Sequence, residues 1–207
     1  MVSTGGEYFP DNCTSPDHVA IIVPYMNRAE QLPVFLGHIH PFLMMQNIHY
    51  RIYIVNQEDS NNFNRAGLMN VGFKESLKDF YWTCFIFHDV DTLPEDARNL
   101  YSCPDQPRHM AVAVDRWNYK LLYPTYFGGI VALRREHFET INGVSNLFWG
   151  WGGEDDDMYK RVINNGMKIT RYEDDVARYT TIKHGRAKAN PDRFEILKQV
   201  KGRCVLM

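Results

Sequence analysis

The chain has 207 residues, 44% of them hydrophobic, which is enough for one globular domain with a sizeable core. Its 23 Lys and Arg side chains nearly balance its 25 Asp and Glu side chains, so the composition gives no sign of a nucleic-acid or anionic-membrane partner. No apolar run approaches the roughly 18 to 20 residues that cross a bilayer; we therefore expect a cytosolic protein or the soluble piece of an anchored one.

Apolar runs alternate with helix-compatible stretches along the chain. Residues 64–77 form the clearest predicted helix, and we expect Leu68 and Val71 to face inward. This alternation predicts a doubly wound α/β sheet, whose ligands bind beyond the carboxyl ends of the strands. The predicted strands are residues 19–23, 50–55, 84–87, 110–114 and 129–133.

Two carboxylates, Asp89 and Asp91, follow the third predicted strand. At a strand end, an Asp-x-Asp pattern directs both carboxylates the same way, which suits Mg²⁺ or Mn²⁺ shared with the phosphates of a nucleotide. His184 is the best candidate for a further ligand because it opens a polar loop, residues 183–193, that we expect to be mobile. His88 is a rival, although strand alternation turns it away from Asp89.

The run at residues 148–157 sets two tryptophans and three glycines against four consecutive carboxylates. Such a run suits sugar chemistry, because an aromatic face stacks on a pyranose ring while a carboxylate takes a hydroxyl proton. The alternative is an ordinary helix start, which favours acidic residues. Met158, Val162 and Ile163, followed by Gly166, do predict an amphipathic helix after the run.

Arg65 opens the helix of residues 64–77, where an arginine could meet a diphosphate or a base, although arginines at helix starts are usually solvated. Farther along, Tyr126 precedes Gly128 and Gly129, whose missing side chains allow close backbone approach. The nearby aromatic rings could stack on a ligand or simply be core; they belong to Trp117, Tyr119 and Tyr123.

The four cysteines leave their pairing open, because three full connectivities are possible. A disulfide between Cys84 and Cys103 would close a loop around an acidic turn, with a nominal gain of about 3 kcal/mol. Cys13 and Cys204 lie near the two ends. Asn12 opens an Asn-Cys-Thr glycosylation pattern, which matters only in the secretory pathway.

Six segments, read together and in order, resemble the animal β-1,4-galactosyltransferases, glycosyltransferase family 7: PYMNR, FNRAGLMNVGF, CFIFHDVD, YFGGIVAL, FWGWGGEDDD and IKHGR. The resemblance runs from about Gly5 to Leu197. It implies an α/β fold of the GT-A type, Rossmann-like with a doubly wound mixed sheet. Residues 1–207 would be one catalytic domain of a type II membrane protein in the Golgi lumen, without its membrane anchor and without the family's C-terminal end.

The implied activity is an inverting, Mn²⁺-dependent transfer of galactose from UDP-galactose to the 4-hydroxyl of a terminal N-acetylglucosamine. By resemblance, Asp155 is the catalytic base, and Asp91 and His184 are manganese ligands. Thr181 stands where many members have a methionine ligand. The implied donor-binding residues are Pro24, Tyr25, Arg28, Phe63, Arg65, Asp89, Val90, Arg116, Tyr126 and Trp151.

The resemblance also implies an acceptor site and a closing motion. Trp151 would tip a small loop over the donor, and residues 182–197 would close over the bound donor before the acceptor binds. A tyrosine at Tyr126 implies galactose rather than N-acetylgalactosamine as the transferred sugar. The Cys84–Cys103 disulfide is also implied. The implied acceptor-binding residues are Tyr123, Gly153, Glu154, Asp155, Arg193, Phe194 and Leu197.

The chain departs from the family pattern in several places. Thr181 replaces a methionine ligand, and its neutral hydroxyl is a poorer partner for Mn²⁺. Met26 replaces an arginine in the first segment that faces the nucleotide. The closing loop is short, and the chain ends early and lacks the upstream cysteine that would pair with Cys13. Open alternatives are transfer of N-acetylgalactosamine, transfer of galactose to xylose, or a silent sugar-binding module. Any modifier protein remains unidentified.

Overall fold

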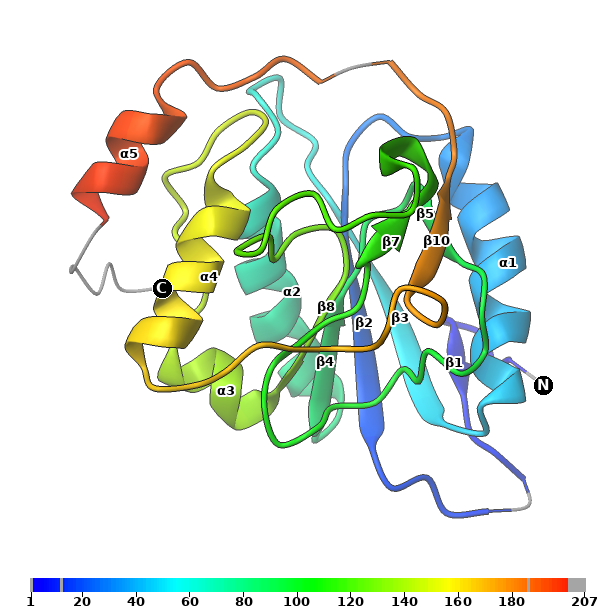
Figure 1. Ribbon diagram of the computed structural model, residues 1–207. Helices are drawn as coiled ribbons and strands as arrows, with labels where there is room; N and C mark the ends of the chain where they lie inside the picture. The colour runs from blue at the N-terminus through cyan, green and yellow to red at the C-terminus, as the bar shows by residue number, and fades with distance from the viewer. Residues whose placement is uncertain (1, 12, 186, 201–207) are drawn as a thin grey trace.

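The computed structural model describes residues 2–11, 13–185 and 187–200, and a mixed seven-stranded sheet forms its centre (Figure 1). The strand order is β1-β3-β2-β4-β8-β6-β9. The strands are β1 (Glu7–Tyr8), β2 (His18–Tyr25), β3 (His49–Asn56), β4 (Cys84–Phe87), β6 (Arg108–His109), β8 (Val131–Arg134) and β9 (Thr170–Arg171). A second sheet, in the order β5-β10-β7, contains β5 (Thr92–Pro94), β7 (Ala113–Val114) and β10 (Arg178–Thr181).

The central strands are the ones that the apolar runs predicted. β2 pairs in parallel with β3 on one side and with β4 on the other, and the interior residues of β2 are fully buried. Strands covered on both faces read as continuous apolar runs, as in β2. β8 then pairs antiparallel to β4, which makes the sheet mixed, as expected.

Helices cover both faces of this sheet (Figure 1). α1 (Gln31–Met45) packs on one face through Phe35, Ile39 and Leu43. α2 (Arg65–Asp79), α3 (Arg135–Thr140) and α4 (Glu154–Asn164) lie on the other face. The doubly wound prediction is confirmed. A last helix, α5 (Arg193–Gln199), lies apart from the sheet, beyond α4.

One of the two residues predicted to face inward does not. Val71 is 48% exposed, whereas Leu68 is half-buried. The buried apolar side chains of α2 are instead Ala66, Met69 and Phe73, which keep the spacing of one helical stripe. The sheet that a helix covers decides which of its side chains are buried. A single apolar residue beside the buried stripe therefore does not show which face of the helix packs inward.

The predicted strand at residues 110–114 is wrong as a single element. Met110 and Ala111 both donate their backbone N–H groups to the carbonyl of Ile130, which interrupts the ladder after β6. The chain then enters β7, which pairs with β10 in the second sheet. The whole run is buried, so its hydrophobicity gives no sign of the change of sheet.

The disulfide between Cys84 and Cys103 is present, as expected. Cys13 is exposed and forms no disulfide with any cysteine that the structure describes, whereas Cys204 and Asn12 lie outside the described residues. Among the helices of residues 2–11, 13–185 and 187–200, none is both long enough and apolar enough to span a membrane.

Candidate active site

The site forms where β2 and β4 end, beside the start of α2. Asn64 caps α2 by accepting a hydrogen bond from the Gly67 N–H at 2.7 Å, and the helix begins at Arg65. The Arg65 guanidinium donates from Nε to Asp89 Oδ1 at 2.8 Å and from Nη2 to the Gly129 carbonyl at 2.8 Å. Its third neighbour is Glu154 at 3.9 Å. Arg65 therefore joins three segments that are far apart in the sequence.

Asp89 and Asp91 take different partners. β4 ends at Phe87, so the two aspartates lie in the following turn rather than along a strand. Asp89 pairs with Arg65, whereas Asp91 Oδ2 lies 2.5 Å from His184 Nε2. His88, the rival ligand, is buried and directs Nε2 to the Tyr101 hydroxyl at 2.8 Å. The structure thus joins Asp91 to His184 and removes His88 from the candidates.

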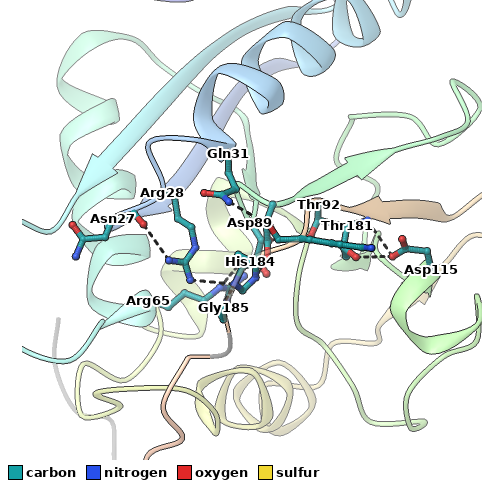
Figure 2. A network of polar contacts seen from close by, with 12 residues as sticks. Asn27, Arg28, Gln31, Arg65, Asp89, Thr92, Asp115, Thr181, His184 and Gly185 are labelled. Carbon is teal, nitrogen blue, oxygen red and sulfur yellow. Dashed lines mark hydrogen bonds and ion pairs between the residues drawn. The ribbon is translucent and has the colours of Figure 1, made fainter.

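Arg28, one of the predicted donor-binding residues, lies beside His184 (Figure 2). Arg28 Nη2 is 3.3 Å from His184 Nδ1, and Gln31 Nε2 donates to the Lys183 carbonyl at 3.4 Å. Pro24 is buried and Tyr25 half-buried at the end of β2. Val90 is buried between Asp89 and Asp91, so its side chain is not open to a ligand.

Thr181 has a partner of its own. Its hydroxyl donates to Asp115 Oδ1 at 2.8 Å, and its backbone N–H donates to the same oxygen at 3.0 Å (Figure 2). In the part of the chain that the structure describes, no group of three or more His, Cys, Asp and Glu side chains is arranged to hold a metal ion. Asp91 and His184 supply one oxygen and one nitrogen donor, a set that suits Mn²⁺ if a ligand completes the coordination.

The two carboxylates that open α4 are half-buried and have raised pKa values. Burial and the neighbouring Asp155 charge raise the pKa of Glu154, against the opposing effect of Arg65. Burial and the Asp156 charge likewise raise the pKa of Asp155. Glu154 Oε2 is buried and has no hydrogen-bond partner among the described residues. An unpartnered buried oxygen of this kind is available to a ligand.

Gly128 lies against both Tyr126 and Asp155. A Cβ placed on Gly128 would lie 2.9 Å from Asp155 Oδ2 and 2.8 Å from the Tyr126 hydroxyl, so only glycine fits there. Tyr126 is buried, and burial raises its pKa well above the ordinary value. Its ring meets the rings of Trp117 and Tyr123 edge-on. Some of these aromatic side chains therefore belong to the core, and others border the candidate site.

The carboxylates of the acidic run have different partners along α4. The Tyr123 hydroxyl donates to Asp156 Oδ1 at 3.2 Å. One residue later, Asp157 is buried and accepts from Arg161 Nε at 2.7 Å. Thus the first two carboxylates face the site, while the last one is part of the core.

Backbone hydrogen bonds join the Trp151 segment to the loop that was predicted to close. The Trp151 N–H donates to the Lys188 carbonyl at 3.1 Å, and the Asn190 N–H donates to the Trp151 carbonyl at 3.0 Å. The Gly150 N–H donates to the Phe63 carbonyl at 2.8 Å, which brings Phe63 to the same place. The Trp151 side chain remains 62% exposed.

The end of the predicted closing loop is helical, because α5 begins at Arg193. Arg193 donates from Nη1 to the Asn190 carbonyl at 2.9 Å and packs against Gly152. Phe194 is 58% exposed beneath the Arg193 guanidinium, and Leu197 is half-buried. Gly153, whose φ of +98° suits glycine, caps α4 between these residues and the acidic run.

Sequence reasoning missed three residues of the site's surroundings. Asp115 holds Thr181, and Arg171 and His109 hold the backbone around Tyr126. Arg116, a predicted donor residue, is exposed and lies over the Trp117 ring at 4.5 Å. No local pattern marks Asp115 or Arg171, since each acts on a segment far away in the sequence.

Two family models match the chain. The N-terminal region of glycosyl transferase group 7 covers residues 1–104, and the N-terminal domain of galactosyltransferase covers residues 108–185. The chain is 50% identical over 200 residues to β-1,4-galactosyltransferase 4 of Cricetulus griseus, covering 95% of this chain and 58% of that protein. It is 48% identical over 203 residues to human β-1,4-galactosyltransferase 1, covering 97% of this chain and 51% of that protein. The chain thus spans little more than half the length of these curated relatives.

Solved structures agree with these matches. The catalytic domain of Drosophila β-1,4-galactosyltransferase 7, in complex with xylobiose, has a TM-score of 0.76 and 33% identity, covering 88% of this chain and 79% of that one. A mutant of the same Drosophila protein, solved with manganese, UDP-Gal and xylobiose, has a TM-score of 0.68 and 37% identity. That match covers 75% of this chain and 64% of the other.

Proposed function

The chain belongs to the glycosyl transferase group 7 family of β-1,4-galactosyltransferases, and from this membership we propose that it transfers galactose from UDP-galactose to the 4-hydroxyl of a terminal N-acetylglucosamine. The proposed reaction inverts the anomeric carbon. Relatives at 48–50% identity carry the β-1,4-galactosyltransferase name, and a Drosophila relative was solved with UDP-Gal and manganese.

The observation that carries this proposal is the pair of half-buried carboxylates with raised pKa values at the start of α4, the second of which lies close to Gly128. A carboxylate with a raised pKa is a stronger base than a solvated one, which suits removal of a proton from a sugar hydroxyl. We assign the base to Asp155, as the acceptor oxygen bonds to the anomeric carbon and the bond to UDP breaks on the opposite side. Glu154 Oε2, which lacks a partner among the described residues, would accept from another acceptor hydroxyl.

Asp91 and His184 would hold the manganese ion, with diphosphate oxygens completing its coordination. The bound ion would stabilise the negative charge of the departing UDP. Thr181 donates its hydroxyl proton to Asp115, and its oxygen remains the third candidate ligand. With only two or three candidate protein ligands, the ion would bind together with the nucleotide.

The donor would lie along the ends of β2 and β4. Arg28 and Arg65 bring positive charge to this edge, and Phe63 lies where the Gly150 segment meets α2. Among the other donor candidates, Tyr25 and Trp151 offer aromatic faces, Arg116 an exposed guanidinium, and Asp89 a fixed partner for Arg65. Pro24 and Val90 are buried and would act by shaping the edge.

The acceptor would lie between Tyr123 and α5. Gly153, Arg193, Phe194 and Leu197 would border the acceptor on this side; Phe194 is exposed, and Arg193 and Leu197 are partly exposed. Because the Trp151 segment is bonded to residues 188–190, we propose that the two segments close together over the donor and complete the acceptor site.

The deciding experiment is a measurement of UDP release with purified protein. UDP-galactose and UDP-N-acetylgalactosamine are each offered with N-acetylglucosamine, xylose or no acceptor, with Mn²⁺ or with a chelator. We expect manganese-dependent release with UDP-galactose and N-acetylglucosamine. Turnover with xylose alone would point to the xylose-directed activity, and binding of UDP-galactose without turnover would point to a sugar-binding module.

Two matched variants test the base. Asp155→Asn should abolish nearly all release, whereas Glu154→Gln should mainly raise the KM for the acceptor, because it removes a contact and keeps the base. If Asp155→Asn retained the wild-type rate and Glu154→Gln lost it, the two roles would be exchanged.

We also propose that the chain works in the lumen of the secretory pathway, in the Golgi, as part of an anchored protein. The Cys84–Cys103 disulfide supports this location, because disulfides persist in oxidising compartments. Fractionation of cells that express the full-length protein, with protease protection of the lumenal side, tests the location.

A further inference from the structure

The segment that carries Tyr126 has no regular secondary structure, yet three of its carbonyls are tied down. Arg171 Nη2 donates to the carbonyls of Pro124 at 3.0 Å and Tyr126 at 2.9 Å. His109 Nε2 lies 3.1 Å from the carbonyl of Gly128. Two side chains from other parts of the chain thus hold alternate residues of one irregular segment.

His109 and Arg171 also bond to each other. Arg171 Nε donates to His109 Nδ1 at 3.2 Å, so Nδ1 must be an acceptor and the ring proton must lie on Nε2. Burial and the nearby guanidinium lower the pKa of His109 to about 3, so the imidazole is neutral. The neutral tautomer then donates from Nε2 to Gly128, which completes the chain of hydrogen bonds.

The pair is placed by the sheet. β6 and β9 are parallel neighbours, with His109 in register with Arg171. From this strand pair, the His109 ring meets the Tyr126 ring edge-on, at 5.1 Å between centroids and 84° between planes. The position of Tyr126 is therefore fixed both through its backbone and through its ring.

Arg171 uses its charge in an unusual way. No ion pair in the part of the chain that the structure describes includes Arg171, and burial lowers its pKa. The cation is directed at three neutral acceptors: two carbonyls and one imidazole nitrogen. A half-buried cation without an acidic partner is costly, which argues that the geometry it enforces is useful.

We infer that Arg171, acting with His109, is a positioning residue that fixes the Tyr126 side chain and so sets which nucleotide sugar the donor pocket accepts. The inference about sugar choice rests on the proposed function. Gly128 lies against both the Tyr126 ring and the Asp155 carboxylate, so a shift of this segment would move Tyr126 relative to the proposed base and change the room for a substituent on the donor sugar.

The test compares Arg171→Met with Arg108→Met. Arg108 is a matched control, because it precedes His109 in β6, is buried and lies over the Tyr172 ring, and donates to the Leu100 carbonyl, away from Tyr126. Arg171→Lys and His109→Gln are milder variants, in case Arg171→Met fails to fold. Lysine keeps a charge that can reach the two carbonyls but loses the fork that also meets His109.

Two readouts are needed. The first is ¹⁹F NMR of protein labelled with fluorotyrosine, in which the Tyr126 resonance is assigned by its loss in Tyr126→Phe. The second is the ratio of kcat/KM for UDP-galactose to that for UDP-N-acetylgalactosamine. We expect Arg171→Met to shift or broaden the Tyr126 resonance and to reduce the ratio by about tenfold, with partial rescue by Arg171→Lys. Arg108→Met should leave both readouts unchanged.

The inference is overturned if Arg171→Met and the milder variants keep the wild-type Tyr126 resonance and the wild-type ratio while losing only thermal stability, as Arg108→Met would. The proposed function fails separately, if the wild type turns over neither nucleotide sugar. In that case the ¹⁹F spectrum still decides whether Arg171 positions Tyr126.

Discussion

The two faces of α4 place carboxylates in opposite electrostatic surroundings. On the core face, Asp157 is buried and pairs with Arg161 at 2.7 Å, and it also accepts from the Ser145 N–H. On the site face, Asp155 and Glu154 are half-buried with raised pKa values, and Arg65 compensates their charge only in part. A buried carboxylate that is paired with a cation supports the fold as long as the pair is intact. A carboxylate whose negative charge is only partly compensated binds a proton more readily and can act as a base.

The largest difference between the faces should appear in turnover. Asp155→Asn should lower kcat by about 10²- to 10⁴-fold, the range of general-base catalysis, without loss of stability because it removes a poorly compensated charge. Steady-state UDP release and a thermal melt measure the two effects. If the melting temperature of Asp155→Asn fell by many degrees, Asp155 would be needed for stability, as Asp157 is.

On the core face, the same kind of change should act on stability. Asp157→Ala leaves the Arg161 guanidinium buried without its partner and should lower the free energy of unfolding by about 3–5 kcal/mol. Urea denaturation measures this loss. As a control, Asp157→Leu combined with Arg161→Met should cost less than the sum of the single changes, because no unpaired charge remains.

A substitution just beyond the C-terminal end of α4 should have a smaller effect on stability and should leave the site unaffected. Gly166 follows the helix with a φ of +75° and has open space around its Cβ position. Gly166→Ala should therefore cost about 1–2 kcal/mol of stability through backbone strain alone. The kcat of the folded variant should equal that of the wild type; a lower kcat would mean that α4 transmits strain to its acidic start.

The smallest effect should be a dependence of stability on pH. Because burial raises the pKa of Glu154 in the folded state, the folded state binds its proton more tightly than the unfolded state does. The destabilisation from this group is absent below the unfolded pKa, grows as the pH rises between the unfolded and the folded pKa, and is complete above the folded pKa of about 7.

Glu154→Gln removes this titration, so the melting temperature of the variant should exceed that of the wild type at pH 8 and approach it near pH 4. The expected difference in stability is on the order of 1 kcal/mol. A constant difference across this pH range would contradict the assigned shift.

The fold was largely predictable because its central strands are buried on both faces, and such strands read as apolar runs. Helix starts were also predictable where a capping residue marks them, as Asn64 does for α2. The break at residues 110–114 was not, because both halves of that run are buried and only the partner strands differ. Val71 shows the related limit: one apolar residue does not say which side of a helix meets a sheet.

The resemblance supplied the pairing of Asp91 with His184, two distant residues that lie in contact in the structure. The roles that it implies for Asp155 and Trp151 stay predictions. The contacts of Thr181 with Asp115, and of Arg171 with the Tyr126 segment, join residues that are more than forty positions apart. No spacing rule relates them, because their distance in space is set by how the two sheets are assembled.

The small sheet β5-β10-β7 has a consequence for how the chain tolerates changes in length. Asp91 immediately precedes β5, Asp115 immediately follows β7, and His184 lies just beyond β10. Their relative positions are fixed by the pairing of three short strands and not by the segments that connect them. Insertions in the exposed connection at residues 173–175 should therefore cost little closure entropy and leave these side chains in register.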